Sequence, residues 1–140
     1  MMERTLIIIK PDGVKRGLEK IIVKRYEDAV LKMIKRKELV ATPQLLKKHY
    51  SAHLTKPFYS YLEKFMSSGP VVAMVFEGQD AVAVARKITG ATDPAKAEKG
   101  TIRREFGDLS LPDDDRIMMN LVHASENKEE AKREIKLWFG

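Results

Sequence analysis

The sequence predicts an α+β fold. Its 140 residues are enough for one domain with a buried core and too few for two. Three short apolar runs and one more polar strand segment are separated by segments with helical periodicity, and their order contains the unit βαββαβ. This unit is typical of a ferredoxin-like α/β sandwich, in which helices pack on one face of a four-stranded, mostly antiparallel sheet.

The N-terminal third predicts a strand, a helix and a second strand. The apolar run Arg4–Lys10 predicts a buried strand that ends in the turn Pro11-Asp12-Gly13. Apolar residues recur at helical spacing over Leu18–Val30, which predicts the first helix. The more polar segment Met33–Ala41 favours a strand at the edge of the sheet.

Two helices and a third strand are expected next. Thr42 as N-cap and Pro43 at the first helical position begin a helix that continues to Tyr50. A second helix is expected over Pro57–Met66, and the apolar run Val71–Phe76 predicts a buried strand.

The C-terminal half predicts one more helix and strand before the last helix. Asp80 is expected to cap a helix that ends near Thr89, and Gly90–Gly100 is expected to be a loop. The apolar run Ile117–Val122 predicts the last strand.

Composition excludes several classes of protein. The formal net charge of +6 allows binding of a polyanion, but basic and acidic residues are interleaved, and aromatic residues make up only 7%. The chain has no cysteine, which excludes disulfides and thiolate sites. The longest apolar runs, Leu6–Ile9 and Val71–Phe76, are too short to span a bilayer, and Met1–Arg4 does not begin a signal peptide. We therefore expect a cytoplasmic protein.

Phosphate-binding glycine motifs are absent, so any phosphate would have to be held by side chains. His49 and His53 lie four residues apart, but no third ligand is near them in sequence. We therefore predict no metal site and expect both histidines to be surface or rim residues.

His123 lies where an apolar strand ends, before a helix that is predicted to run from an Asn127 cap to Trp138. Position alone favours a structural histidine. Glu134, however, lies against the buried stripe of that helix and needs a partner there. If this carboxylate holds one ring nitrogen of His123, the other nitrogen is free to act as a nucleophile.

The segment Asn120–Glu126 (NLVHASE) resembles the active-site signature of nucleoside diphosphate kinases, N-x-x-H-G-S-D. Further segments resemble the family in the same order and spacing; they are Thr5–Val14, His49-Tyr50, Lys56-Pro57-Phe58, Ser68–Val75, Gly90–Pro94 and Gly100–Arg103. The resemblance covers nearly the whole chain and implies the ferredoxin-like fold already predicted.

The resemblance implies ping-pong transfer of the terminal phosphoryl group from a nucleoside triphosphate, mainly ATP, to a nucleoside diphosphate. His123 would carry the group, Glu134 would orient its ring, and Ser125 would lie within hydrogen-bonding reach of the pair. Lys10 would offset charge on the transferring group, and Tyr50 would stand near it.

The resemblance also implies a nucleotide site with little base selectivity. Its residues would hold the phosphates, the sugar and the base; they are Arg86, Thr92 and Arg103 for the phosphates, Lys10 and Asn120 for the sugar hydroxyls, and Phe58 for the base. Mg²⁺ would arrive bound to the nucleotide phosphates, because no carboxylate cage is evident.

The chain also departs from the family pattern. Ala124 and Glu126 replace the usual glycine and aspartate, and Val30 stands where the family often has glycine. The segment Gly107–Met119 is longer than usual. The family pattern nevertheless places an apolar residue, here Ile117, against the base.

The expected partners are nucleotides and further copies of the chain, as a tetramer or hexamer, with no membrane and no specific nucleic acid. The edge strand Met33–Ala41 would be protected by such an assembly. The alternative is an inactive nucleotide- or nucleic-acid-binding regulatory module of the same fold.

Overall fold

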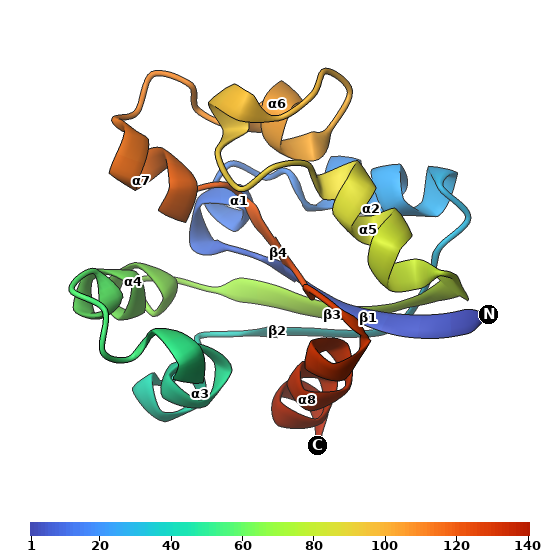
Figure 1. Cartoon of the computed structure of the whole chain (residues 1–140), viewed down its shortest axis with the longest axis horizontal. Helices are drawn as coiled ribbons and strands as arrows, with labels where there is room; N and C mark the ends of the chain where they lie inside the picture. The colour runs from blue at the N-terminus through green and yellow to red at the C-terminus, as the bar shows by residue number, and fades with distance from the viewer.

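A four-stranded sheet with helices on both faces forms the framework of the protein, which a computed structural model describes over residues 1–140 (Figure 1). Every neighbouring pair of strands is antiparallel, and the strand order is β2-β3-β1-β4. The strands are β1 (Met2–Ile9), β2 (Lys32–Leu39), β3 (Val71–Gln79) and β4 (Val122–Ala124). The fold class predicted from the sequence is therefore confirmed.

The helices divide between the two faces of the sheet. On one face lie α2 (Glu19–Asp28), α5 (Ala81–Thr89) and α6 (Ile102–Phe106), and on the other α3 (Pro43–His49), α4 (Tyr59–Met66) and α8 (Lys128–Phe139) (Figure 1). The remaining elements are α1 (Pro11–Lys15), η1 (Ser51–His53), η2 (Pro94–Lys96) and α7 (Asp113–Met118). The expectation that helices cover only one face is wrong.

Alternation along the two central strands explains why both faces are covered. In β1, Ile7 and Ile9 join the apolar cluster beneath α2 and α5, whereas Leu6 and Ile8 join the cluster beneath α3 and α8. Successive side chains of a strand point to opposite faces, and an unbroken apolar run must therefore be buried on both.

Local capping confirms several predicted helices. The Thr42 hydroxyl accepts from the Leu45 backbone N–H at 3.2 Å, and the Asn127 side chain accepts from the Glu130 N–H at 2.8 Å. Asp80 precedes α5 as predicted, but it makes no side-chain cap. Glu3 provides the acceptor instead, at 3.2 Å from the Val82 N–H.

Three segments differ from the sequence prediction. Pro11-Asp12-Gly13 begins α1 rather than a simple turn, because proline suits the first position of a helix. The predicted strand Ile117–Val122 is wrong: α7 extends to Met118, and β4 begins only at Val122. Helix α6 was not predicted, although the Thr101 hydroxyl caps it by accepting from the Arg104 N–H.

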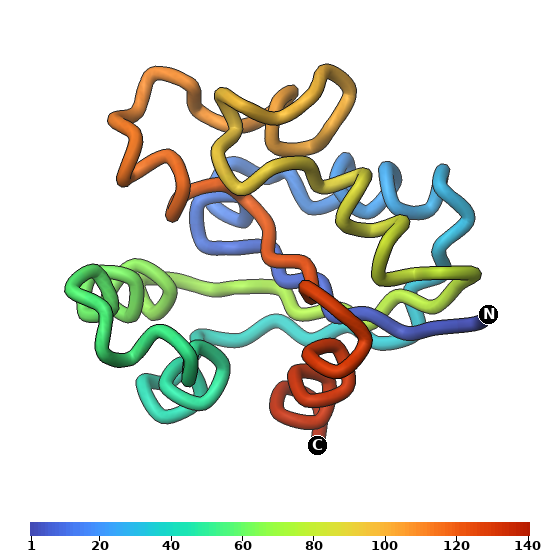
Figure 2. Tube along the Cα trace, viewed as in Figure 1, coloured from blue at the N-terminus to red at the C-terminus, as the bar shows by residue number.

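The path of the chain brings the segment after α7 back to the sheet, where β4 is the edge strand beside β1 (Figure 2). There β4 pairs with β1, and His123 lies opposite Ile8 in the register. Leu121, just before β4, has a φ of +77° in the left-handed region. Its N–H donates to an Asp12 carboxylate oxygen at 3.1 Å and its carbonyl accepts from the Lys10 N–H at 2.8 Å, so α1 and β1 hold this strained residue in place.

Candidate active site

His123 and Glu134 form the hydrogen-bonded pair that the sequence predicts. The Nε2 atom of His123 lies 2.9 Å from Oε1 of Glu134. An ionised carboxylate can only accept, so Nε2 carries the proton and Nδ1 has a free lone pair. Strand β4 carries the histidine, and α8 carries the carboxylate over the end of the sheet.

Ser125 supports this pair from behind. Its hydroxyl donates to the same Glu134 oxygen at 2.8 Å and accepts from the Leu6 backbone N–H at 3.2 Å. Ser125 is fully buried, and it therefore contacts the carboxylate rather than the open site.

The Glu134 carboxylate remains ionised despite its burial. Burial by itself would raise its pKa, but the hydrogen bonds from His123 and Ser125 and the charge of Arg133 hold the pKa below its ordinary value. A fixed negative charge at Nε2 keeps the His123 ring in one tautomer and one orientation.

A cavity of about 420 Å³ opens beside His123. It brings together most of the predicted site residues, from segments spread over the whole chain; they are Lys10, Tyr50, Arg86, Thr92, Arg103, Asn120, His123 and Glu134. Ser125 lies behind Glu134, and Phe58 is half exposed outside the cavity lining. A larger groove of about 670 Å³, between the N-terminal strand and α8, contains none of these residues.

Lys10 is buried on one wall of the cavity. Its ammonium donates to the side-chain oxygen of Asn120 at 2.8 Å and to the Met118 carbonyl at 3.1 Å. Burial, together with the nearby charge of Arg103, lowers the Lys10 pKa to about 7.

Asn120 connects Lys10 to two loops. Its amide nitrogen donates to the carbonyls of Thr92 and Ile117, each at 2.9 Å. Because all three of these bonds fix the amide orientation, the end of α7 and the loop that carries Thr92 are held against Lys10.

Two guanidinium groups line the cavity near His123. Arg103 is buried and donates to the carbonyls of Gly90 at 3.0 Å and Val122 at 2.6 Å. Its Nε atom is buried without a partner, and burial lowers its pKa to about 10. Arg86 is exposed and donates to the Ala124 carbonyl at 3.3 Å. This cationic wall suits an anionic ligand with several oxygen atoms.

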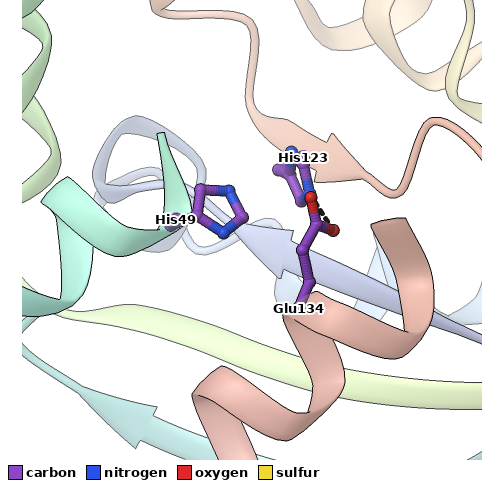
Figure 3. A group of neighbouring side chains, drawn as sticks. All are labelled: His49, His123 and Glu134. Atoms are coloured by element: carbon purple, nitrogen blue, oxygen red, sulfur yellow. Dashed lines mark hydrogen bonds and ion pairs between the residues drawn. The ribbon is translucent and has the colours of Figure 1, made fainter. Parts of the chain in front are cut away.

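Sequence reasoning missed the position of His49. The prediction of a surface or rim residue is wrong, because His49 is buried with only 4% of its surface exposed. Its ring centroid lies 4.6 Å from that of His123, at an interplanar angle of 76° (Figure 3). The available signal was helical spacing, since Leu46 and His49 lie three residues apart on the buried side of α3.

The chain is similar to known proteins over nearly its whole length. The family model described as "Nucleoside diphosphate kinase" matches residues 3–140. Curated proteins named "Nucleoside diphosphate kinase" include one from Dehalococcoides mccartyi, which is 50% identical over 99% of this chain and 92% of its own length. Another, from Prochlorococcus marinus, is 47% identical over 98% of this chain and 86% of its own length. The chain belongs to the nucleoside diphosphate kinase family.

Solved structures of the nucleoside diphosphate kinase family share the fold. The enzyme from Encephalitozoon cuniculi is similar with a TM-score of 0.92 and 40% identity, over 99% of this chain and 89% of the other. The Aquifex aeolicus protein gives a TM-score of 0.91 and 38% identity, over 100% and 96% of the two chains. The family binds nucleotides. None of the helices in this chain is both long and apolar enough to cross a membrane.

Proposed function

We propose that this protein is a nucleoside diphosphate kinase that carries the terminal phosphoryl group on His123. The observation that carries the proposal is the His123–Glu134 hydrogen bond of 2.9 Å beside a cavity lined by Lys10, Arg86 and Arg103. A nucleophile with a fixed tautomer and a cationic pocket meets the two needs of phosphoryl transfer, which are positioning and charge stabilisation.

In the proposed reaction, Nδ1 of His123 attacks the terminal phosphorus of a nucleoside triphosphate, mainly ATP. The N–P bond forms as the bond from phosphorus to the bridging oxygen breaks, and the nucleoside diphosphate leaves with that electron pair. The ring becomes positively charged, and the Glu134 carboxylate at Nε2 stabilises this charge. A second nucleoside diphosphate then takes the group from His123 by the reverse of these steps.

The remaining predicted residues are proposed to hold the nucleotide. Arg86, Arg103 and Thr92 would contact phosphate oxygens, and Lys10 and Asn120 would hold the sugar hydroxyls. Lys10 would also offset charge on the transferring phosphoryl group, and Tyr50, which lines the cavity, would stand beside that group. Phe58 is half exposed beside His53, with 6.1 Å between ring centroids, and is available to stack on a base.

Mg²⁺ is proposed to enter with the nucleotide rather than to occupy a site of the protein. The phosphate side of the cavity is cationic, and Glu134 is already engaged by His123 and Ser125. When bound to the phosphates, the ion would neutralise charge on their oxygens.

Incubation with radiolabelled ATP alone tests the proposal. The wild type should form a phosphoprotein that is stable in alkali and labile in acid, and unlabelled ADP should remove the label. The His123→Ala variant should remain unlabelled. Absence of label on the wild type would favour the alternative, an inactive regulatory module, and a turnover assay would then show no phosphoryl transfer.

We also propose a single domain over residues 1–140 that assembles into a cytoplasmic homo-oligomer, a tetramer or hexamer, without specific nucleic acid. Strand β2 supports the assembly because it lies at the edge of the sheet with one side unpaired within the chain. Sedimentation that finds only a 16.0 kDa species would contradict it.

A further inference from the structure

Helix α8 holds two imidazoles through side chains that lie one helical turn apart. Glu134 accepts from Nε2 of His123 at 2.9 Å. Trp138, four residues later, donates from its indole Nε1 to Nδ1 of His49 at 3.0 Å. Residues at i and i+4 share one face of a helix, so one rigid element fixes both rings.

The bond from Trp138 determines the tautomer of His49. An indole N–H is only a donor, and Nδ1 of His49 must therefore be the acceptor. A neutral His49 consequently carries its proton on Nε2. Burial is the main cause that lowers the His49 pKa well below its ordinary value, and the charges of His123, Arg133, Lys10 and His53 act in the same direction.

The same bond argues against a metal ion between these side chains. His49, His123 and Glu134 each offer an atom, and these atoms lie within 4.8 Å of one another (Figure 3). A metal on Nε2 of His49 would move the proton of the neutral ring to Nδ1, where it would face the Trp138 N–H. Binding through Nδ1 is blocked by the indole itself.

The Nε2–H group of His49 has no hydrogen-bond partner within the protein, although His49 is 4% exposed and lines the cavity that contains His123. The Nε2 atom is not fully buried, so its N–H is open to an acceptor that a ligand in the cavity supplies. The His49 ring packs edge to face against the His123 ring, with 4.6 Å between the ring centroids, and the donor therefore belongs to the ring next to the proposed nucleophile.

We propose that His49 is a further catalytic residue, a neutral hydrogen-bond donor whose Nε2–H binds an oxygen of the phosphoryl group transferred at His123, with Trp138 as the positioning residue that fixes its tautomer. The inference rests on the proposed phosphohistidine chemistry. A neutral donor stabilises the charge that develops on these oxygens without repelling the imidazolium that forms at His123.

Two substitutions at position 49 separate this donor from simple packing. The amide oxygen of His49→Asn lies near the Nδ1 position and can still accept from Trp138, but no donor reaches the Nε2 position. The longer amide of His49→Gln reaches the Nε2 position and can donate there. We expect His49→Asn to slow phosphorylation of His123 by labelled ATP about 10- to 100-fold, as for loss of one hydrogen bond to a charged group, with unchanged affinity for ADP. His49→Gln should recover most of the rate.

Nuclear magnetic resonance tests the tautomer independently of activity. Histidine ¹⁵N spectra of the wild type should show His49 protonated on Nε2 alone, and Trp138→Phe should abolish this preference. The chain has one tryptophan, so the indole N–H gives a single resonance. That resonance should move in His49→Phe, which removes the acceptor.

Several outcomes would overturn the inference. These are a wild-type phosphorylation rate in His49→Asn, a His49→Gln variant as slow as His49→Asn, or a wild-type His49 protonated on Nδ1. A wild type that takes no label from ATP would instead refute the proposed function and leave the tautomer result standing.

Discussion

The Arg116 guanidinium binds both carboxylate oxygens of Asp93, at 2.6 and 2.9 Å. Arg116 lies in α7, and Asp93 directly follows Thr92, which lines the cavity. The pair therefore ties α7 to the loop proposed to bind phosphate. A two-bond contact of this kind fixes orientation as well as distance.

Breaking this pair should weaken nucleotide binding more than it slows the chemical step. We expect Arg116→Gln and Asp93→Asn each to raise KM for nucleotides roughly 3- to 10-fold with a smaller change in kcat. The double variant should be little worse than either single variant, since both remove the same interaction. Steady-state kinetics of all four proteins would show this, and additive losses would contradict the coupling.

Nucleotide affinity should fall as the pH rises above 7 because of Lys10. Its pKa is lowered from 10.5 to about 7 by burial and by the charge of Arg103, so the ammonium loses its proton above pH 7. Nucleotide phosphates favour the charged form, and binding at pH 8 to 9 must then take up a proton, which costs affinity by up to about tenfold per pH unit.

Calorimetry of ADP binding in buffers of different ionisation enthalpy would measure this proton uptake. Lys10→Arg is the matched control, because a guanidinium stays charged over this range. Equal pH dependence in the wild type and Lys10→Arg would show that another group is responsible.

Glu134→Gln should slow phosphorylation of His123 while changing nucleotide affinity little. The amide lacks the negative charge that stabilises the imidazolium, and a loss of about 10- to 100-fold is expected for one charge-assisted hydrogen bond. Rapid-quench measurement of phosphoprotein formation would test this. Glu129→Gln, an exposed position on the same helix, should match the wild type.

Val30→Gly should stabilise the protein. Val30 has a φ of +65° and is 86% exposed. It follows α2 in a helix-ending motif, in which the Leu31 N–H bonds to the Tyr26 carbonyl, and glycine is the usual residue there. A β-branched residue is strained in this conformation, so we expect a gain of roughly 1 kcal/mol and a Tm higher by about 2 to 5 °C.

Val40→Gly is the control for this substitution. Val40 is 55% exposed, but its φ is not positive, so glycine should only add freedom to the unfolded chain and lower the Tm. A fall in Tm for both variants would show that Val30 is not strained.

Ile117→Ala should weaken all nucleotides by similar, modest factors and raise KM more than it lowers kcat. Ile117 lines the cavity at the end of α7 and is partly exposed, which suits an apolar contact on one face of a base. Such a contact does not distinguish exocyclic groups. Kinetics with adenine, guanine and pyrimidine nucleotides would test this, and unchanged KM values would mean that another residue meets the base.

Local chemistry was sufficient to predict much of this fold. The continuous apolar runs in β1 and β3 identified two buried strands. They did not show that helices cover both faces of the sheet. Caps at Thr42 and Asn127 fixed helix starts because each uses atoms only three residues away. The family resemblance supplied the roles of the site residues, and their common cavity agrees with it.

The tertiary structure decided features that depend on residues far apart in sequence. The apolar run Ile117–Val122 predicted a strand, but its first two residues end α7, where Lys10 and Asn120 bind their carbonyls. The burial of His49 depends on Trp138, which lies 89 residues away. The tautomer of His49, like that of His123, is set by a hydrogen-bond partner that only folding brings within reach. The proton of a neutral imidazole can occupy either ring nitrogen, and a neighbouring donor or acceptor decides which tautomer is the more stable.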